Sequence, residues 1–330
     1  MLKFFKHSYI AQLVVIVLLI VVLWLPVFIS QAYEIAVENP ITPLYNIIVN
    51  ICGHSSVVIS ILAFVVFIVN VLFFNSMLSV NQFVTRNSSI GAFVFVLCMC
   101  CIPMQDEYYP FLLASPFIMI AIQTMYLIYQ VDRPEMYLMN SGFFIALASM
   151  FYFPAIILIF WVLVSISIMD FKELKHYLIP VLGFFFPYFI LLVLFYFNHT
   201  LVENINTYLL SFNEMGLEKL GVKTADFVVL VIVLALTWLS LMVIMSDKMD
   251  NSVATRKKVS ETIWLFFFGF VMLFMQKPVM YNGLIFMVLA TFVSMVLCYV
   301  KKTKIMDIVI VVMMLVIIVN QYLPLFGVVL

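Results

Sequence analysis

The sequence is a succession of apolar runs of membrane-spanning length, separated by short polar segments. The first run extends from Tyr9 to Ser30, and similar runs recur along the whole chain. A helix of about 20 apolar residues crosses the hydrocarbon core of a bilayer. Backbone N–H and C=O groups in lipid must bond within the protein, and an α-helix satisfies them within one segment. The runs therefore predict an all-α, polytopic membrane helix bundle.

Composition agrees with this interpretation. Hydrophobic residues make up 66% of the chain and charged residues 10%, and the mean hydropathy is +1.23. A soluble domain carries about 25% charged residues, so this chain has too few to cover a surface that faces water. Basic and acidic residues are equal at 16 each. The chain therefore lacks the excess of basic residues that would indicate a nucleic-acid partner.

Apolar runs bounded by charges, Asn or Pro define the candidate spans. Three runs, 90–104, 138–151 and 262–276, are shorter than the usual length and are predicted to be tilted, broken or re-entrant. The count is therefore about 9–11 within a single integral domain, 1–330. The candidate spans are 9–30, 55–75, 90–104, 110–130, 138–151, 153–169, 177–197, 226–246, 262–276, 279–300 and 305–328.

Charge asymmetry predicts the orientation. With the N-terminus inside, 13 of the 16 basic residues fall on inner segments, and only Lys219, Lys223 and Lys277 fall outside. The positive-inside rule predicts this bias, so the N-terminus is expected in the cytoplasm. No small-residue cleavage site follows the first run, which predicts an uncleaved first helix.

Three segments are expected at the outer face. The segments 31–54 and 198–225 are predicted to hold short interfacial helices, the alternative being ordinary connecting loops. The segment Phe151–Pro154 is predicted to be a tight turn between two short helices. Non-helical backbone within the bilayer is tolerated only where protein surrounds it or where it lines a cavity.

Ionisable side chains within the predicted spans are almost absent, the exception being Asp307 near the inner end of the last span. Proton-coupled carriers and voltage sensors rely on buried charges, so this scarcity argues against both. Neutral polar residues within the spans are predicted to form helix–helix hydrogen bonds. They are Asn70, Gln123, Thr124, Thr237, Ser240 and Ser294.

Histidine and cysteine patterns predict no metal site. The four histidines, His7, His54, His176 and His199, are divided between the two faces and are expected to be solvated or satisfied at the surface. Cys98, Cys100 and Cys101 lie in an apolar run without CxxC-type spacing, so they are predicted to be packing residues.

Carboxylates of the outer face are the remaining candidates for chemistry. Glu34 and Glu38 are four residues apart, on one face if the segment is helical. Asp106 and Glu107 lie in a short outer loop. A carboxylate at the rim of a bundle can act as a general base or hold a divalent metal. The alternative is that outer loops carry charge simply to meet water.

Two stretches, Gln105–Ile118 and Ser141–Ala155, resemble an uncharacterised family of polytopic inner-membrane proteins from Bacteroidota, which implies a location in the cell envelope. The second stretch is also similar to a segment of the glycosyltransferase-C superfamily. That resemblance implies transfer from lipid-phosphate-linked sugars at the outer face, with Glu34 or Glu38 as the acid of the first outer loop. The Asp-centred motif of that loop is missing here.

Three hypotheses for function remain open, and whether the chain is an enzyme is undecided. The first is an envelope-assembly protein, glycosyltransferase-C-like, that acts on polyprenyl-linked sugars. The second is a non-catalytic subunit or scaffold of a membrane complex that docks a protein partner through 198–225. The third is a lipid or small-molecule carrier. In the first, Glu34, Glu38, Asp106 or Glu107 supplies the base, and His199, Lys219 or Lys277 faces the lipid phosphate.

Overall fold

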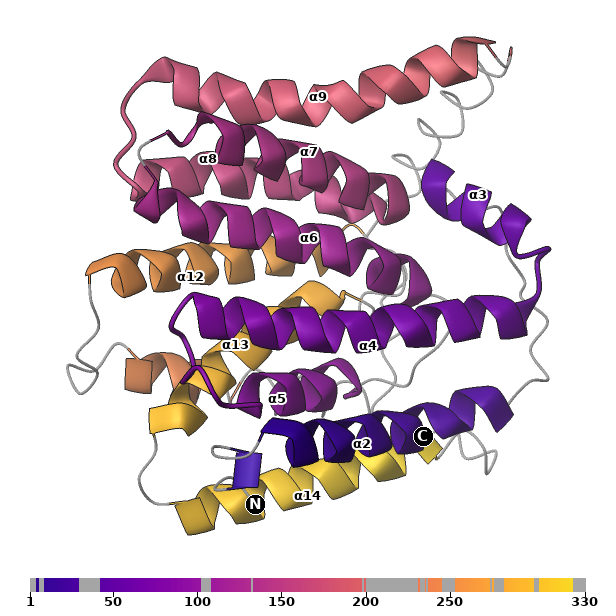
Figure 1. Cartoon of the computed structure of the whole chain (residues 1–330), viewed down its shortest axis with the longest axis vertical. Helices are drawn as coiled ribbons and strands as arrows, with labels where there is room; N and C mark the ends of the chain where they lie inside the picture. The colour runs from indigo at the N-terminus through magenta and orange to yellow at the C-terminus, as the bar shows by residue number, and fades with distance from the viewer. Residues whose placement is uncertain are drawn as a thin grey trace.

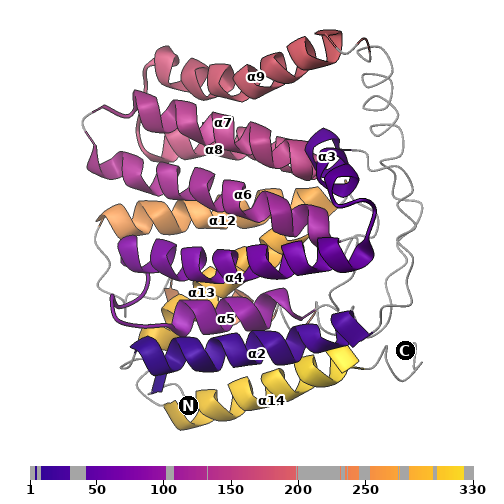
Figure 2. The same ribbon diagram turned by 45° about the vertical axis from the view of Figure 1, so that its right-hand side comes forward.

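The computed structural model is mostly helical in the part of the chain that it describes, without a strand there, as the sequence predicts. The described residues are 4–5, 9–29, 42–101, 108–131, 133–197, 199, 231, 235, 237–244, 253–273, 275, 282–299 and 303–322. The helices lie side by side in a stacked antiparallel bundle (Figure 1), with α9 and α14 at its two edges (Figure 2).

The helices follow the predicted runs closely. They are α2 (Tyr9–Ile29), α3 (Pro43–Ile51), α4 (Ser56–Val80), α5 (Ile90–Met99), α6 (Tyr109–Leu127), η2 (Ile128–Gln130), α7 (Glu135–Phe151), η3 (Phe153–Ile157), α8 (Leu158–Ile168), α9 (Leu174–Phe197), α12 (Val253–Leu273), α13 (Gly283–Tyr299) and α14 (Thr303–Tyr322).

Four helices are long and apolar enough to cross a membrane: Ala11–Ile29, Ser56–Val80, Tyr109–Leu127 and Leu174–Phe197. Their outward faces are apolar; α9, for example, exposes Leu182, Phe185 and Phe189. Lipid tolerates such faces because its tails are equally apolar. These are the helices of a membrane-spanning protein.

The chain reverses direction from helix to helix, so its turns gather at two ends of the bundle. The turns α4–α5, α6–α7 and α8–α9 lie together at the left in Figure 1. We call this the basic end, because the described basic side chains lie there: Arg86, Arg133, Lys172, Lys175, Arg256, Lys257 and Lys258. Phe5 also lies at this end, since its carbonyl accepts a hydrogen bond from the Ser89 N–H at 3.1 Å.

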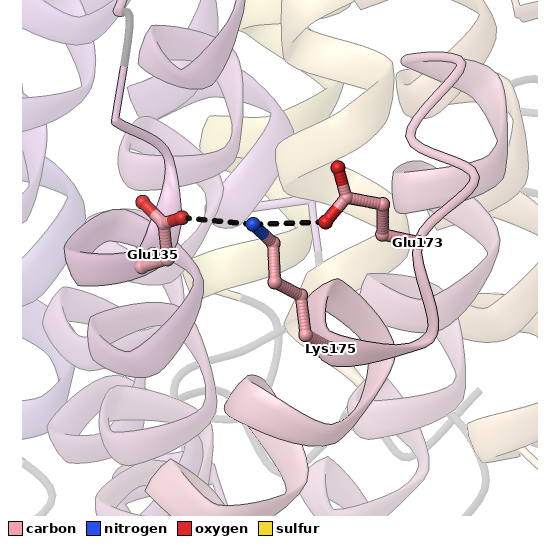
Figure 3. Close-up of polar contacts among 3 residues, drawn as sticks. All are labelled: Glu135, Glu173 and Lys175. Carbon is pink, nitrogen blue, oxygen red and sulfur yellow. Dashed lines mark ion pairs between the residues drawn. The ribbon is translucent and has the colours of Figure 1, made fainter.

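An ion pair network ties the helix starts together at the basic end (Figure 3). Lys175 Nζ lies 2.8 Å from Glu173 Oε2 and 3.7 Å from Glu135 Oε1. Glu135 begins α7 and Lys175 lies in the first turn of α9. These side chains are about half exposed, so the pairs mainly orient the turn rather than stabilise the bundle.

Helices α7 and α9 approach each other through small residues. A Cβ built on Gly142 would lie 1.9 Å from the carbonyl oxygen of Pro180, and one on Gly183 would lie 2.3 Å from the carbonyl oxygen of Met139. Only glycine fits at either point. Small residues give membrane helices the close backbone contact that lipid exclusion alone does not provide.

Polar side chains join α4 to α6 at three levels along the bundle. The pairs are Ser60 with Tyr109 at 3.0 Å, Asn70 with Ser115 at 2.5 Å and Asn81 with Gln123 at 2.6 Å. The predicted helix–helix role of Asn70 and Gln123 is therefore confirmed. Thr124 instead donates to the Ala121 carbonyl of its own helix, and the Ser294 hydroxyl has no partner.

The short helix α5 ends inside the bundle, where its last carbonyls need donors. Gln321 and Asn320 of α14 supply them, donating to the Cys100 carbonyl at 2.9 Å and the Cys101 carbonyl at 3.0 Å. Cys98, Cys100 and Cys101 are buried and free, as expected of packing residues.

The predicted tight turn after Phe151 is confirmed. Tyr152 breaks the helix with φ −137° and ψ 97°, and η3 follows directly. Tyr152 and Phe153 are buried, so the irregular backbone lies within the protein. Thr42 Oγ1 donates to the Phe151 carbonyl at 3.0 Å and so satisfies the end of α7.

One predicted interfacial helix is found in part. Residues 43–51 of the segment 31–54 form α3, whereas 31–41 lie outside the described residues. The segment 198–225 also lies outside them, apart from His199.

The predicted start of α12 at residue 262 is wrong. The helix begins at Val253, because the charged stretch read as a loop consists largely of good helix formers without Pro or Gly. The first half of α12 is therefore part of the bundle.

Replacing Gly142 with Ala is expected to lower the free energy of unfolding by about 1–3 kcal/mol, because the added methyl group overlaps backbone atoms that cannot move aside. Thermal unfolding in detergent measures the effect. Gly269→Ala is the control, since its Cβ would meet only side-chain atoms, at 3.3 Å or more. Equal unfolding temperatures for the two variants would contradict the close α7–α9 contact.

Candidate functional site

Most of the residues proposed from sequence lie outside the described part of the chain. These are Glu34, Glu38, Asp106, Glu107, Lys219 and Lys277. His199 is described; it is exposed in the turn after α9, with a left-handed φ of +56°. The outer-face site therefore stays a prediction.

The described structure directs attention to the first half of α12, where two charged side chains are buried. Lys258 is 3% exposed and Glu261 is 0% exposed. Their neighbours come from three other helices or turns. We call this group the α12 polar cluster: Asn81, Gln123, Tyr126, Trp161, Lys258, Glu261 and Thr262.

Lys258 links α12 to the end of α4. Its Nζ donates to Asn81 Oδ1 at 2.9 Å. Asn81 Nδ2 in turn donates to Gln123 Oε1 at 2.6 Å and to the Met77 carbonyl at 2.8 Å. Asn81 is the C-cap residue of α4. One amide side chain thus connects α4, α6 and the buried ammonium group.

Thr262 and Trp161 fix the other side of the cluster. Thr262 Oγ1 donates to the Lys258 carbonyl at 2.7 Å, so it accepts from Tyr126 Oη at 2.6 Å. Trp161 Nε1 donates to the Glu261 carbonyl at 3.0 Å. Both anchors are buried. They hold α12 against α6 and α8 at the level of the two charged residues.

The Glu261 side chain is the exception in this otherwise bonded cluster. Neither of its carboxyl oxygens has a hydrogen-bond partner, and no ion pair joins it to Lys258, although both residues are described. Burying a carboxylate anion without donors costs several kcal/mol. The neutral acid is therefore the form that this packing accommodates.

Few titratable groups surround Glu261. Among the described residues, Lys257 and Lys258 lie on its own helix and Tyr126 reaches the cluster from α6. The segments η3 and α8, packed against α12, carry no titratable side chain, and α13, also packed against it, carries titratable residues only at its C-terminal end, Cys298 and Tyr299. Any charge that develops on Glu261 is therefore balanced chiefly by Lys258.

Lys258 and Glu261 lie just before the predicted span 262–276, so the predicted scarcity of charge within the spans did not include them. Lys258 and Glu261 are three residues apart, so a helix places them on one face. The sequence feature that could have predicted the early start of α12 is the absence of Pro or Gly between Val253 and the apolar run after Thr262. Extending the helix back through that stretch brings both charges into the bundle.

A second contact of α12 joins it to the α8–α9 turn. Lys257 Nζ is 2.5 Å from Asp170 Oδ2 in the α8–α9 turn, and 5.6 Å above the ring of Tyr129. Asp170 has a left-handed φ of +67°, which Asp tolerates better than most residues. The hydrogen bond from Lys257, with its charge, holds the pKa of Asp170 below its ordinary value.

The other candidates for chemistry are weaker. His176 is buried against Phe171, with ring centroids 4.9 Å apart, and its Nδ1 has no partner; the expectation of a surface histidine is wrong there. Within the described ranges, no group of three His, Cys, Asp or Glu residues is placed to hold a metal ion.

No protein-family model, no functionally described protein and no solved structure matches this chain. The α12 polar cluster is therefore interpreted from its own geometry.

Asp170 is expected to titrate below ordinary aspartate, whose pKa is about 3.9, because Lys257 stabilises its charged form. Its contribution to the α8–α9 turn is thus present at neutral pH and is lost as the pH falls through this lowered value. Carbon NMR of labelled aspartate measures the midpoint.

Lys257→Met should raise the Asp170 midpoint towards the ordinary value and leave Glu173 unchanged, because the pKa of Glu173 is lowered by Lys175 instead. An Asp170 midpoint that does not respond to Lys257→Met would contradict this contact.

Proposed function

We propose that this chain is a proton-coupled carrier of a lipid or small molecule, with Glu261 as the proton-binding residue. The observation that carries the proposal is the fully buried, unpartnered carboxyl group of Glu261 beside the buried ammonium group of Lys258. Ionisable side chains inside membrane bundles are rare and commonly belong to proton relays or substrate pathways.

The cluster supports a specific coupling step. When Glu261 loses its proton, the new anion attracts Lys258, which lies on the same helix face. Moving towards Glu261 takes the ammonium group away from Asn81 Oδ1, its partner at 2.9 Å. Deprotonation thereby exchanges a contact between α12 and α4 for one within α12.

This exchange reaches the interface between α4 and α6. Asn81 is bonded to Gln123 as well as to Lys258, so releasing the ammonium group frees Asn81 to reorient. A carrier needs two such arrangements of its helices, each favoured by a different ligand state. Here the ligand that selects between them is the proton.

We further propose that the basic end faces the cytoplasm of a bacterial cell, across the inner membrane. Its cluster of described Lys and Arg side chains is the bias that the positive-inside rule expects. Phe5 lies at the same end, which supports a cytoplasmic N-terminus. Proton entry to Glu261 would then be controlled from the cytoplasmic side.

The carrier proposal is preferred to the glycosyltransferase-C-like and scaffold hypotheses because two buried ionisable side chains, Glu261 and Lys258, lie one turn apart on α12. The catalytic version depends on Glu34, Glu38, Asp106 and Glu107, and the scaffold version depends on 198–225. Both remain predictions.

Proton movement into proteoliposomes made from bacterial polar lipids, which supply candidate lipid substrates, tests the proposal. Vesicles hold an entrapped pH-sensitive dye, and an acid step is applied outside with the membrane potential clamped. Wild-type protein is expected to acidify the interior faster than protein-free vesicles, because Glu261 takes up and releases protons. Glu261→Gln, which stays neutral, is expected to match the protein-free vesicles.

The matched control is Glu173→Gln, an exposed acid at the same end of the bundle, which should behave like the wild type. Equal proton movement by wild type and Glu261→Gln would contradict the proposal.

A further inference from the structure

The turn between α4 and α5 forms one wall of a cleft of about 870 Å³ at the basic end. Most of its lining is polar, including Ser76, Ser79, Gln82, Thr85, Arg86 and Asn87. None of these residues belongs to the α12 polar cluster. A polar cleft of this size at a bundle end has room for a small ligand or a headgroup.

The charge of the cleft favours an anion. Arg86 is exposed and, among the described residues, has no ion-pair partner, and none of the described residues that line the cleft is Asp or Glu. A guanidinium group presents a planar set of donors that matches phosphate oxygens. Ser and Thr hydroxyls and Asn and Gln amides add further donors around it.

The wall of the cleft is held in place by its own hydrogen bonds. At the end of α4 the Gln82 N–H donates to the Ser79 carbonyl at 3.3 Å and the Phe83 N–H donates to the Leu78 carbonyl at 3.0 Å. This is the Schellman pattern, in which glycine usually takes the left-handed position. Here Gln82 holds it with φ +61°, which keeps a polar side chain at the cleft.

Asn75 fixes the opposite side of the turn. Its Oδ1 accepts from the Ala92 N–H at 3.1 Å, and its Nδ2 donates to the Ser88 carbonyl at 3.3 Å. Asn75 is itself buried. The start of α5 is therefore tied to α4, and the cleft is formed before any ligand arrives.

An exposed apolar stripe on α4 leads to the cleft. Ile61, Val65, Val69 and Leu72 recur at helical spacing and are each 45–52% exposed. The stripe continues through exposed Ser76 to Val80, both of which line the cleft. In a bilayer such a stripe lies against acyl chains. A polar, cationic cleft at its end is where the headgroup of the same lipid would lie.

We propose that this cleft binds the phosphate headgroup of an anionic phospholipid, with Arg86 on the phosphate and the acyl chains along the exposed stripe of α4. Basic pockets between membrane helices on the cytoplasmic side suit such headgroups. The site does not depend on the carrier function and shares no residue with the proton-binding cluster.

Native mass spectrometry of the full-length protein in detergent, titrated with phosphatidylglycerol, tests the proposal. Arg86→Gln should weaken binding about tenfold, since a charge-assisted contact contributes about 1.5 kcal/mol or more. Ser76→Phe should also weaken binding by filling the cleft. Arg133→Gln is the matched control, because Arg133 is likewise exposed at the basic end, and it should bind as the wild type does.

Two results would overturn the proposal. One is equal affinity of the Arg86→Gln and Arg133→Gln variants for phosphatidylglycerol. The other is displacement of the lipid by an equal concentration of inorganic phosphate, which would make the free anion the ligand. Thermal unfolding of each variant confirms that weaker binding does not reflect a misfolded chain.

Discussion

The structure depends on one constraint, the need of polar groups inside an apolar bundle to find partners within the chain. The Asn282 side chain forms two such hydrogen bonds: it donates to the Gly269 carbonyl at 2.7 Å and accepts from the Leu284 N–H at 3.1 Å. Gln321 donates such a hydrogen bond to the Cys100 carbonyl at the end of α5. Among the described residues some other buried polar atoms also lack a partner, such as Ser294 Oγ and His176 Nδ1, but Glu261 is the acid whose two carboxyl oxygens are both buried without one. An unpartnered carboxyl group in such surroundings is the feature on which the proposed proton switch depends.

Apolar runs predicted the helices well because lipid selects directly for apolar side chains along each span. The predicted spans 9–30 and 279–300 match α2 and α13 closely. The predicted helix boundaries were wrong where a helix continued into a charged stretch of sequence. Glu135 begins α7 before the predicted residue 138, and the start of α12 was misplaced more severely. A charged residue ends an apolar run in the sequence, but it does not end a helix when neighbouring helices supply partners or a water-facing end.

The early start of α12 could have been inferred from the sequence, but the grouping of the α12 polar cluster could not. Asn81 lay in a predicted loop, Gln123 and Trp161 lay in separate predicted spans, and Lys258 and Glu261 were assigned to a loop. Only folding brings them together, across α4, α6, α8 and α12. Their placement also separates two features of the basic end. The α12 polar cluster is buried and holds the proposed proton-binding residue, whereas the α4–α5 cleft is open and lined by Arg86.

The protonation state of Glu261 is the most direct test of this account. Infrared difference spectroscopy at neutral pH compares wild-type protein with Glu261→Gln and separates the carbonyl band of a neutral acid from the bands of a carboxylate. The account predicts that the wild type shows a neutral-acid band that Glu261→Gln lacks, and that this band weakens as the pH rises. A difference spectrum at neutral pH with only carboxylate bands would show that Glu261 is already ionised, and would contradict the proposed switch.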